Sequence, residues 1–181
     1  DVAFNPIQFY EEIKKARELF GYDQDILISE RVGILFDHHK FIDAFREAQD
    51  FRKIGTTKSG IGPFYEDNCR RTTRITFADY VSPNFSEKLK EVLETKKSEL
   101  LAVGLDIEKY HKETLEKHER VRSELKRCIQ RLEYRLQEYI KRGDHIIIEG
   151  AQGTLLDINM GTIPDVTSSH LLLGHAFPSL G

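Results

Sequence analysis

The chain has 181 residues, of which 39% are hydrophobic and 31% are charged, and its formal net charge is −3 at pH 7. A chain of this length buries about 70% of its unfolded surface and needs no disulfide to fold. The composition excludes a membrane protein, a collagen, a disordered tail and a disulfide-rich secreted scaffold, and the negative charge gives no global attraction to nucleic acid. We expect a soluble, helix-rich globular chain.

The cysteine content predicts a cytoplasmic protein. Cys69 and Cys128 lack CxxC spacing, which is typical of two ordinary buried thiols in a reducing compartment. The first residues have neither the basic start nor the apolar core of a signal peptide. No apolar run approaches the roughly 20 residues that span a bilayer, so no membrane association is expected.

The predicted elements of the first half are mainly helices. Asn5 is a good N-cap and Pro6 suits the first helical position, and Gly21 ends this first helix. In chain order we then expect a strand over 25–29, a helix that follows 34–36 and fades by 51–53, glycine-rich chain over 55–62, a helix over 65–71, and an irregular stretch or short strand over 75–83.

The second half has the longest helical periodicity. A helix is predicted from about 86 to Gly104, and a longer one over 107–142 that Gly143 ends. A buried strand over 145–148 leads into a glycine-rich turn, which is where open α/β sheets place ligands. The chain reads as one partial domain with a helical entry region (1–53), a phosphate loop with its helix (54–74), a helical subdomain (86–143), and a core strand with a second loop (145–181).

The first group with possible chemistry is Gly55-Thr56-Thr57-Lys58-Ser59-Gly60-Ile61-Gly62-Pro63. Glycines let backbone N–H groups approach an anion, and hydroxyls donate to its oxygens. Arg70, Arg71 and Arg74 follow, and a guanidinium can hold phosphate in a bidentate manner. The spacing fits neither a Walker A loop nor GxGxxG. These residues alone leave open both a phosphate site and a structural turn.

The second group surrounds Gln152 and Thr167. An amide can bind a purine base and a hydroxyl can bind phosphate, but a polar loop satisfied by its own backbone explains the same residues. Asp157 and Asp165 are weak candidates for holding a metal or moving a proton. Residues 109–142 carry a net charge of +5, which is more typical of a solvated helix face than of nucleic-acid binding.

A third group is Asp37-His38-His39. It lacks the HExxH pattern and any CxxC partner, so we predict no metal site here. Neighbouring residues on a helix point in different directions, so the sequence favours surface positions for His38 and His39.

Read together, the motifs resemble those of the adenylosuccinate synthetase family. The first part is Gly55-Thr56-Thr57, then Gly60-Ile61-Gly62-Pro63 and Tyr65-Glu66-Asp67. The second is the run from Glu149 to Ile158, followed by Gly161-Thr162, Pro164 and Val166-Thr167-Ser168-Ser169. The resemblance is strongest over 54–71 and 146–169 and weak in the helices.

That resemblance implies a GTP- and Mg²⁺-dependent ligase that joins IMP to L-aspartate in AMP biosynthesis. Thr57 and Thr167 would donate to the IMP 5′-phosphate, with Gly55, Gly60 and Gly62 as the supporting loop. Gln152 would lie by the 6-position of the purine. Arg71 would reach across a homodimer into the neighbouring subunit's site.

The resemblance also implies what this segment lacks. The family's GTP loop, catalytic Asp and catalytic His precede it, and the groups that bind guanine and aspartate follow it, so we expect an internal segment that is inactive alone. The implied fold is α/β in the full enzyme, a P-loop-like mixed sheet with a helical subdomain, to which this chain gives a mostly helical part and one or two core strands. Lys58, Ser59, Met160 and Asp165 depart from the family pattern, and 170–181 lacks its glycine-rich run. The alternatives are a ligase for another purine nucleotide and a non-catalytic, helical nucleotide-phosphate binding module.

Overall fold

The structure is a computed structural model that describes residues 2–22, 24–51 and 54–180. Its helices are α1 (Pro6–Phe20), α2 (Asp37–Gln49), α3 (Ile61–Cys69), α4 (Phe77–Val81), α5 (Phe85–Thr95), α6 (Lys97–Ala102), α7 (Ile107–Leu125), α8 (Leu132–Arg142) and α9 (Ala176–Leu180). Its strands are β1 (Ala3–Phe4), β2 (Ile28–Ser29), β3 (Gly33–Ile34) and β4 (Ile129–Gln130). A mostly helical segment with little sheet, as predicted, is confirmed.

Local sequence signals fix the first helix. The Asn5 side chain accepts a hydrogen bond from the backbone N–H of Gln8 at 3.1 Å, and Pro6 occupies the first turn of α1. Gly21 ends the helix in the left-handed conformation with φ of 62° and donates its N–H to the carbonyl of Arg17. The predicted boundaries of this helix are confirmed.

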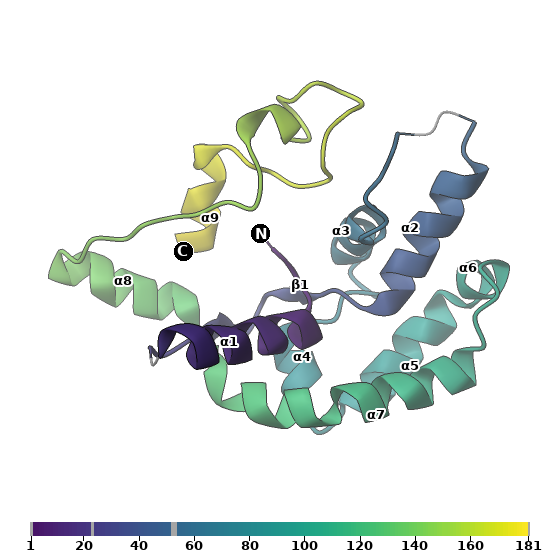
Figure 1. Cartoon of the computed structure of the whole chain (residues 1–181), viewed down its shortest axis with the longest axis horizontal. Helices are drawn as coiled ribbons and strands as arrows, with labels where there is room; N and C mark the ends of the chain where they lie inside the picture. The colour runs from purple at the N-terminus through teal and green to yellow at the C-terminus, as the bar shows by residue number, and fades with distance from the viewer. Residues whose placement is uncertain (1, 23, 52–53, 181) are drawn as a thin grey trace.

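The hydrophobic core lies where α4 and α5 pack on α7, next to the start of α2 (Figure 1). Aromatic rings fill its centre: Phe36 lies 6.1 Å from Phe85, and Tyr80 lies 5.2 Å from Phe85, measured between ring centroids. Each of these side chains is at most 2% exposed. Burial of aromatic area on this scale is the main source of stability for the helical part.

Two short parallel pairings join distant parts of the chain. β1 pairs with β3, with Ala3 opposite Gly33, and β2 pairs with β4, with Ile28 opposite Ile129. The strand expected over 25–29 is therefore reduced to its last two residues. The β1–β3 pairing lies directly before α1 and α2, so it fixes where these two helices begin, and the β2–β4 pairing lies directly before α8.

Two of the predicted elements differ from the structure, one in type and one in continuity. Residues 75–83 contain a helix, α4, because Thr76 accepts from the N–H of Asp79 while the Asp79 carboxylate accepts from Thr76, a reciprocal cap. The single helix expected over 107–142 is broken after Leu125 by a 3₁₀ turn and β4. The break occurs because Ile129 turns inward to pair with β2.

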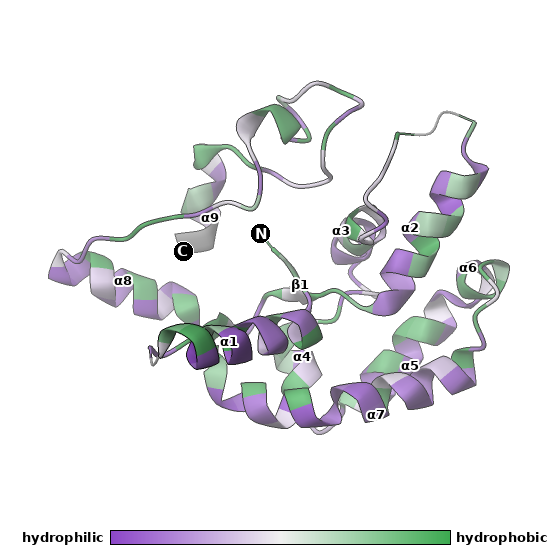
Figure 2. Ribbon diagram, in the orientation of Figure 1, coloured by the Kyte–Doolittle hydropathy of each residue, from purple (hydrophilic) through white to green (hydrophobic). Residues whose placement is uncertain are grey.

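The predicted core strand over 145–148 does not form in this structure. Residues 144–150 have no regular secondary structure, and Ile147 is 94% exposed. Figure 2 shows this hydrophobic stretch as extended chain that leaves α8. A strand needs a neighbour for its hydrogen bonds, and none of the described residues pairs with it. We call residues 144–175 the arch, since they curve away from the helices and return to α9 (Figure 1).

The cysteines do not have the burial that the sequence predicts. Both cysteines are free, but Cys69 is exposed at the end of α3 and Cys128 is half-buried, so the prediction of two buried thiols is wrong. Arg52 and Lys53, where the second helix was expected to fade, lie outside the described residues. Within the described part of the chain, no helix is both long enough and apolar enough to cross a bilayer.

Candidate functional site

The glycine-rich loop of the first motif occupies residues 54–60, between α2 and α3. Gly55 and Gly60 have φ values of 78° and 79°, and Lys58 has the left-handed φ of 54° that a residue with a Cβ rarely adopts. The Thr57 hydroxyl donates to the Ser59 hydroxyl at 2.9 Å, and the N–H of Lys58 donates to the Thr56 hydroxyl at 3.3 Å. Thr57 and Lys58 are exposed at the tip.

The second motif is organised by one carboxylate within the arch. Asp157 is 1% exposed and accepts hydrogen bonds from the backbone N–H groups of Asn159, Met160 and Leu171 at 2.9, 3.0 and 2.6 Å. These backbone donors lower the pKa of Asp157 to about 2, and the N–H of Leu171 has the largest effect. Asp157 is therefore a structural residue of the arch, which removes it as a candidate for holding a metal or moving a proton.

The two motifs meet across one cavity. A cavity of about 470 Å³ is lined by Ile61 and Tyr65 from α3 and by arch residues that include Gln152 and Ser169. The Tyr65 hydroxyl also forms a side-chain hydrogen bond with Ser169. Residues that lie about 90 positions apart in the sequence thus share one concave surface.

The predicted site residues differ in how they relate to this cavity. Gln152 lines it, whereas Thr57, Thr167 and Arg71 are outside its lining. Thr167 is half-buried and donates its N–H to the carbonyl of Leu156 at 2.9 Å, and Arg71 is exposed in the turn after α3. The structure therefore brings Gln152 to the first motif, while the roles of Thr57, Thr167 and Arg71 stay predictions.

Of the three arginines after the first motif, Arg74 already has a partner. Its guanidinium donates to the carbonyl of Arg31 at 2.8 Å, so it braces the chain between β2 and β3. Arg70 and Arg71 are exposed. Tyr65 and Ser169 were not singled out from the sequence as site residues, although both lie within the motifs.

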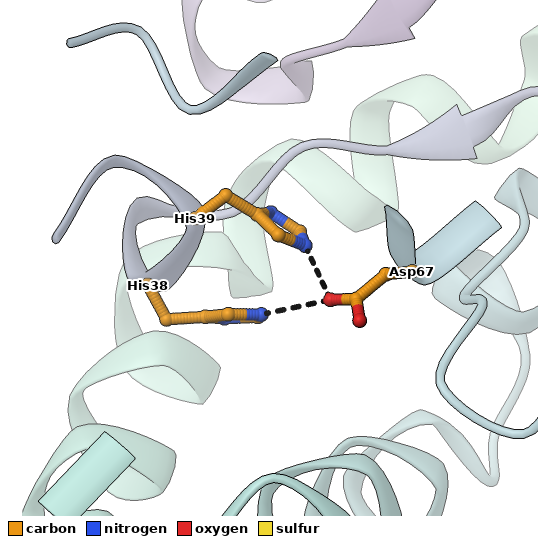
Figure 3. A group of neighbouring side chains, drawn as sticks. All are labelled: His38, His39 and Asp67. Carbon is orange, nitrogen blue, oxygen red and sulfur yellow. Dashed lines mark hydrogen bonds and ion pairs between the residues drawn. The ribbon is translucent and has the colours of Figure 1, made fainter. Parts of the chain in front are cut away.

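The surface positions predicted for His38 and His39 are wrong. The side chains are 1% and 3% exposed, and their ring centroids lie 4.1 Å apart. Figure 3 shows both rings aimed at one oxygen of Asp67, with His39 Nε2 at 3.0 Å and His38 Nε2 at 4.0 Å. The histidines are buried against Asp67 of α3 and against Lys96. Both residues are far away in the sequence, so no local pattern around the histidines predicts their burial.

The charges of this cluster follow from its contacts. Burial raises the pKa of Asp67, but the hydrogen bond from His39 and the ammonium of Lys96, 2.6 Å away, outweigh it and leave that pKa below its ordinary value. Burial lowers the pKa of His38 and of His39, which are therefore neutral. The buried group is a lysine–aspartate ion pair with two neutral imidazoles.

Two histidines and a carboxylate have the donor types of a metal site, but this arrangement does not suit one. Nδ1 of His39 accepts the N–H of Phe36 at 3.0 Å, which makes Nε2 the protonated nitrogen that donates to Asp67. The same Asp67 oxygen already binds Lys96. The cluster instead ties α2, α3 and the junction of α5 with α6 into one body.

Comparison with known proteins identifies the family. The sequence profile of the adenylosuccinate synthetase family matches residues 1–181. The chain belongs to the adenylosuccinate synthetase family. Curated relatives with this name include those of Chlorobium limicola, 39% identical over 99% of this chain, and Thermus thermophilus, 35% identical over 96%.

A solved structure supports the same assignment. It is a fully ligated adenylosuccinate synthetase from Plasmodium falciparum, which matches 99% of this chain with a TM-score of 0.78 and 27% sequence identity. The chain spans 42% of the length of that protein and of the Chlorobium limicola relative. The family resemblance expected from the two motifs is thus confirmed.

Proposed function

We propose that this chain forms the IMP-binding and dimer-contact part of a GTP-dependent ligase that joins IMP to L-aspartate in the synthesis of AMP. One observation carries the proposal: residues of the two motifs that resemble the adenylosuccinate synthetase family line the same cavity, Gln152 among them. A polar amide in a largely preformed cavity is suited to fixing the orientation of a purine.

The proposed roles follow the chemistry of each side chain. Thr57 and Thr167 donate hydroxyl hydrogen bonds to the 5′-phosphate, and Gly55, Gly60 and Gly62 shape the supporting loop. Gln152 lies by the 6-position of the purine, where the oxygen is activated and then displaced by the aspartate amine. Arg71, exposed after α3, adds a guanidinium to the phosphate site of the second subunit of a homodimer.

GTP and Mg²⁺ belong to this reaction, and their ligands are proposed to lie in the part of the family's length that the chain does not span. The residues His38, His39 and Asp67 do not fit Mg²⁺, which prefers oxygen ligands, and their central oxygen is bound to Lys96. This segment is therefore proposed to contain no catalytic residue and to be inactive by itself. The complete enzyme would act in the cytoplasm.

Titration calorimetry of the chain with IMP tests the binding role, with GTP as the control ligand and sedimentation to give the oligomeric state. Heat from IMP but not from GTP, in a dimer, is the expected result. A folded chain that gives no heat with IMP would contradict the proposal that this segment holds the IMP determinants. Binding of GMP in preference to IMP would favour a ligase for another purine nucleotide.

A chimera tests the reaction itself. Residues 1–181 replace the matching segment of the Chlorobium limicola relative, which is 39% identical, and ligase activity is measured with IMP, aspartate and GTP. Activity that is lost on the further change Gln152→Ala supports the proposed role of that amide. A folded chimera without activity would show that this segment is not a ligase part.

A further inference from the structure

Three polar residues of helix α2 form a row along the face of the helix that contacts the glycine-rich loop and α3. His39, Asp43 and Glu47 are spaced four residues apart, which puts them on one face of a helix. His39 donates to Asp67 of α3, and the other two contact the loop. Figure 1 shows α2 and α3 side by side, with the loop running down beside α2 to the start of α3.

The two carboxylates bind the two ends of the loop. Glu47 Oε1 accepts the N–H of Gly55 at 2.8 Å, and Asp43 Oδ2 accepts the N–H of Gly60 at 2.9 Å. Glu47 is 8% exposed and Asp43 is half-buried. Hydrogen bonds to an ionised acceptor are about twice as strong as those between neutral groups. We call Asp43 and Glu47 the carboxylate clamp.

The loop also lies directly on the helix backbone at its second end. A Cβ at Gly60 would come within 2.7 Å of the His39 carbonyl carbon and of the Lys40 nitrogen, and its φ is 79°. Only glycine allows this approach. The loop end is therefore fixed by close packing and by a charged hydrogen bond at the same residue.

The clamp decides which groups of the loop remain for a ligand. The glycine N–H groups that would ordinarily approach an anion are occupied by Asp43 and Glu47 at both ends. The hydroxyls of Thr56, Thr57 and Ser59 and the ammonium of Lys58 lie between these fixed ends, and without a ligand the Thr57 hydroxyl donates to that of Ser59. An anion would bind at the exposed tip, away from the negative charges of the Asp43 and Glu47 carboxylates on α2.

We propose that Asp43 and Glu47 are positioning residues of the phosphate site, which hold the loop ready for the 5′-phosphate before the nucleotide arrives. The inference rests on the proposed function, because it takes IMP as the ligand of this loop. Ordering a loop in advance removes that ordering cost from binding, so affinity depends on residues that never touch the ligand.

Amide hydrogen exchange of the free chain tests the clamp without a ligand. Asp43→Ala should speed exchange at Gly60 by about tenfold or more, and Glu47→Ala should do the same at Gly55, because each loses a charged hydrogen bond. Asp43→Asn and Glu47→Gln keep an acceptor oxygen and should stay within about threefold of the wild type. Asp50→Asn, an exposed carboxylate one residue beyond α2, is the matched control.

Calorimetry with IMP then tests the positioning role on the same variants. The two alanine variants should bind IMP about tenfold more weakly, with recovery in Asp43→Asn and Glu47→Gln and no change in Asp50→Asn. A merely structural role would lower the melting temperature in all clamp variants without this recovery of affinity.

Three results would overturn the inference, and they are distinguishable. Unchanged exchange in the alanine variants would show that the carboxylates do not hold the loop. Faster exchange with unchanged IMP affinity would show that the held shape does not matter for binding, while the proposed function stands. A wild-type chain that binds no IMP would overturn the proposed function, and the positioning role with it.

Discussion

The helical body, residues 2–142, and the arch, residues 144–175, are held together by different forces. The body buries large aromatic and aliphatic side chains such as Phe36, Tyr80 and Phe85. In the arch, two polar side chains, Asp157 and Ser169, are buried, while many of its large hydrophobic side chains are exposed, namely Ile147, Ile148, Leu155, Leu156, Met160, Ile163 and Leu173. The body is therefore stabilised by apolar burial and the arch by hydrogen bonds to one carboxylate, and the arch exposes an apolar surface.

The largest expected effect is from truncating the same residue type in the body and in α9, the helix into which the arch leads. Phe85→Ala removes a fully buried ring and should lower the free energy of unfolding by about 3–5 kcal/mol. Phe177→Ala, in α9 beside the arch, changes a ring that is 73% exposed and should stay within about 0.5 kcal/mol of the wild type. Urea unfolding followed by circular dichroism measures both. Equal losses would contradict the contrast between the buried core of the body and the exposed surface of the chain that follows it.

The next effect concerns the buried ion pair of the body. Lys96→Met leaves the Asp67 carboxylate buried without its cation and should cost about 3 kcal/mol of unfolding free energy. Adding Asp67→Asn to Lys96→Met removes the stranded charge, so the double variant should regain a large part of that loss. Thermal unfolding compares the single and double variants.

Lys97→Met is the matched control for that prediction. Its ammonium pairs with Glu94 on the surface, where an ion pair contributes about 0–1 kcal/mol. A loss in Lys97→Met as large as that in Lys96→Met would mean that burial does not govern the strength of these pairs.

A smaller and local effect is expected in the arch. Asp157→Asn weakens the three bonds to backbone N–H groups, so amide exchange at Asn159, Met160 and Leu171 should speed up while the helical circular dichroism signal stays constant. Asp165→Asn, at an exposed carboxylate in the same arch, should leave exchange unchanged. Loss of the helical signal in Asp157→Asn would show that arch and body unfold together.

Acid should have the same local effect. An aspartate has a pKa of about 3.9 in an unfolded chain, whereas in the folded arch the pKa of Asp157 is about 2. The folded pKa is the lower one, so the stabilisation by Asp157 is complete above about pH 5 and is lost as the pH falls from 4 through 2. Exchange in the arch, measured against pH in wild type and Asp157→Asn, should converge near pH 2.

The smallest effect should come from the exposed stretch of the arch. Ile147→Ser replaces a side chain that is 94% exposed, and its unfolding free energy should stay within about 0.5 kcal/mol of the wild type. Urea unfolding measures it. A loss above 1 kcal/mol would show that Ile147 is buried in solution, for example between two copies of the chain.

Sequence reasoning succeeded where the signal and its cause lie within a few residues. The cap at Asn5, the proline at position 6 and the stop at Gly21 define α1 by themselves. The reciprocal cap of Thr76 with Asp79 is an equally local signal for α4, and it favours a helix over the irregular stretch or short strand predicted for 75–83. The two motifs likewise predicted the family, which the match over residues 1–181 confirms.

Sequence reasoning failed where the cause is distant. The burial of His38 and His39 depends on Asp67 and Lys96, and the break after Leu125 depends on pairing with Ile28. An apolar run such as 145–148 favours a strand, but strand pairing also needs a neighbouring strand, which no local pattern predicts. Of the candidate site, Gln152 could be named from the family motif, whereas its position on the cavity and the contacts of Tyr65, Ser169 and the carboxylate clamp required coordinates.

The pairing of β2 with β4 has a consequence for the order of folding. It joins Ile28 to Ile129, and Arg131 adds an ion pair to Glu30 at 3.1 Å, so a loop of about 100 residues is closed by a few bonds. Closing such a loop before its interior is compact costs chain entropy that two residue pairs cannot recover. We expect the helices from α2 to α7 to pack first. The β2–β4 pairing should form last, in the step that packs α1 against α7.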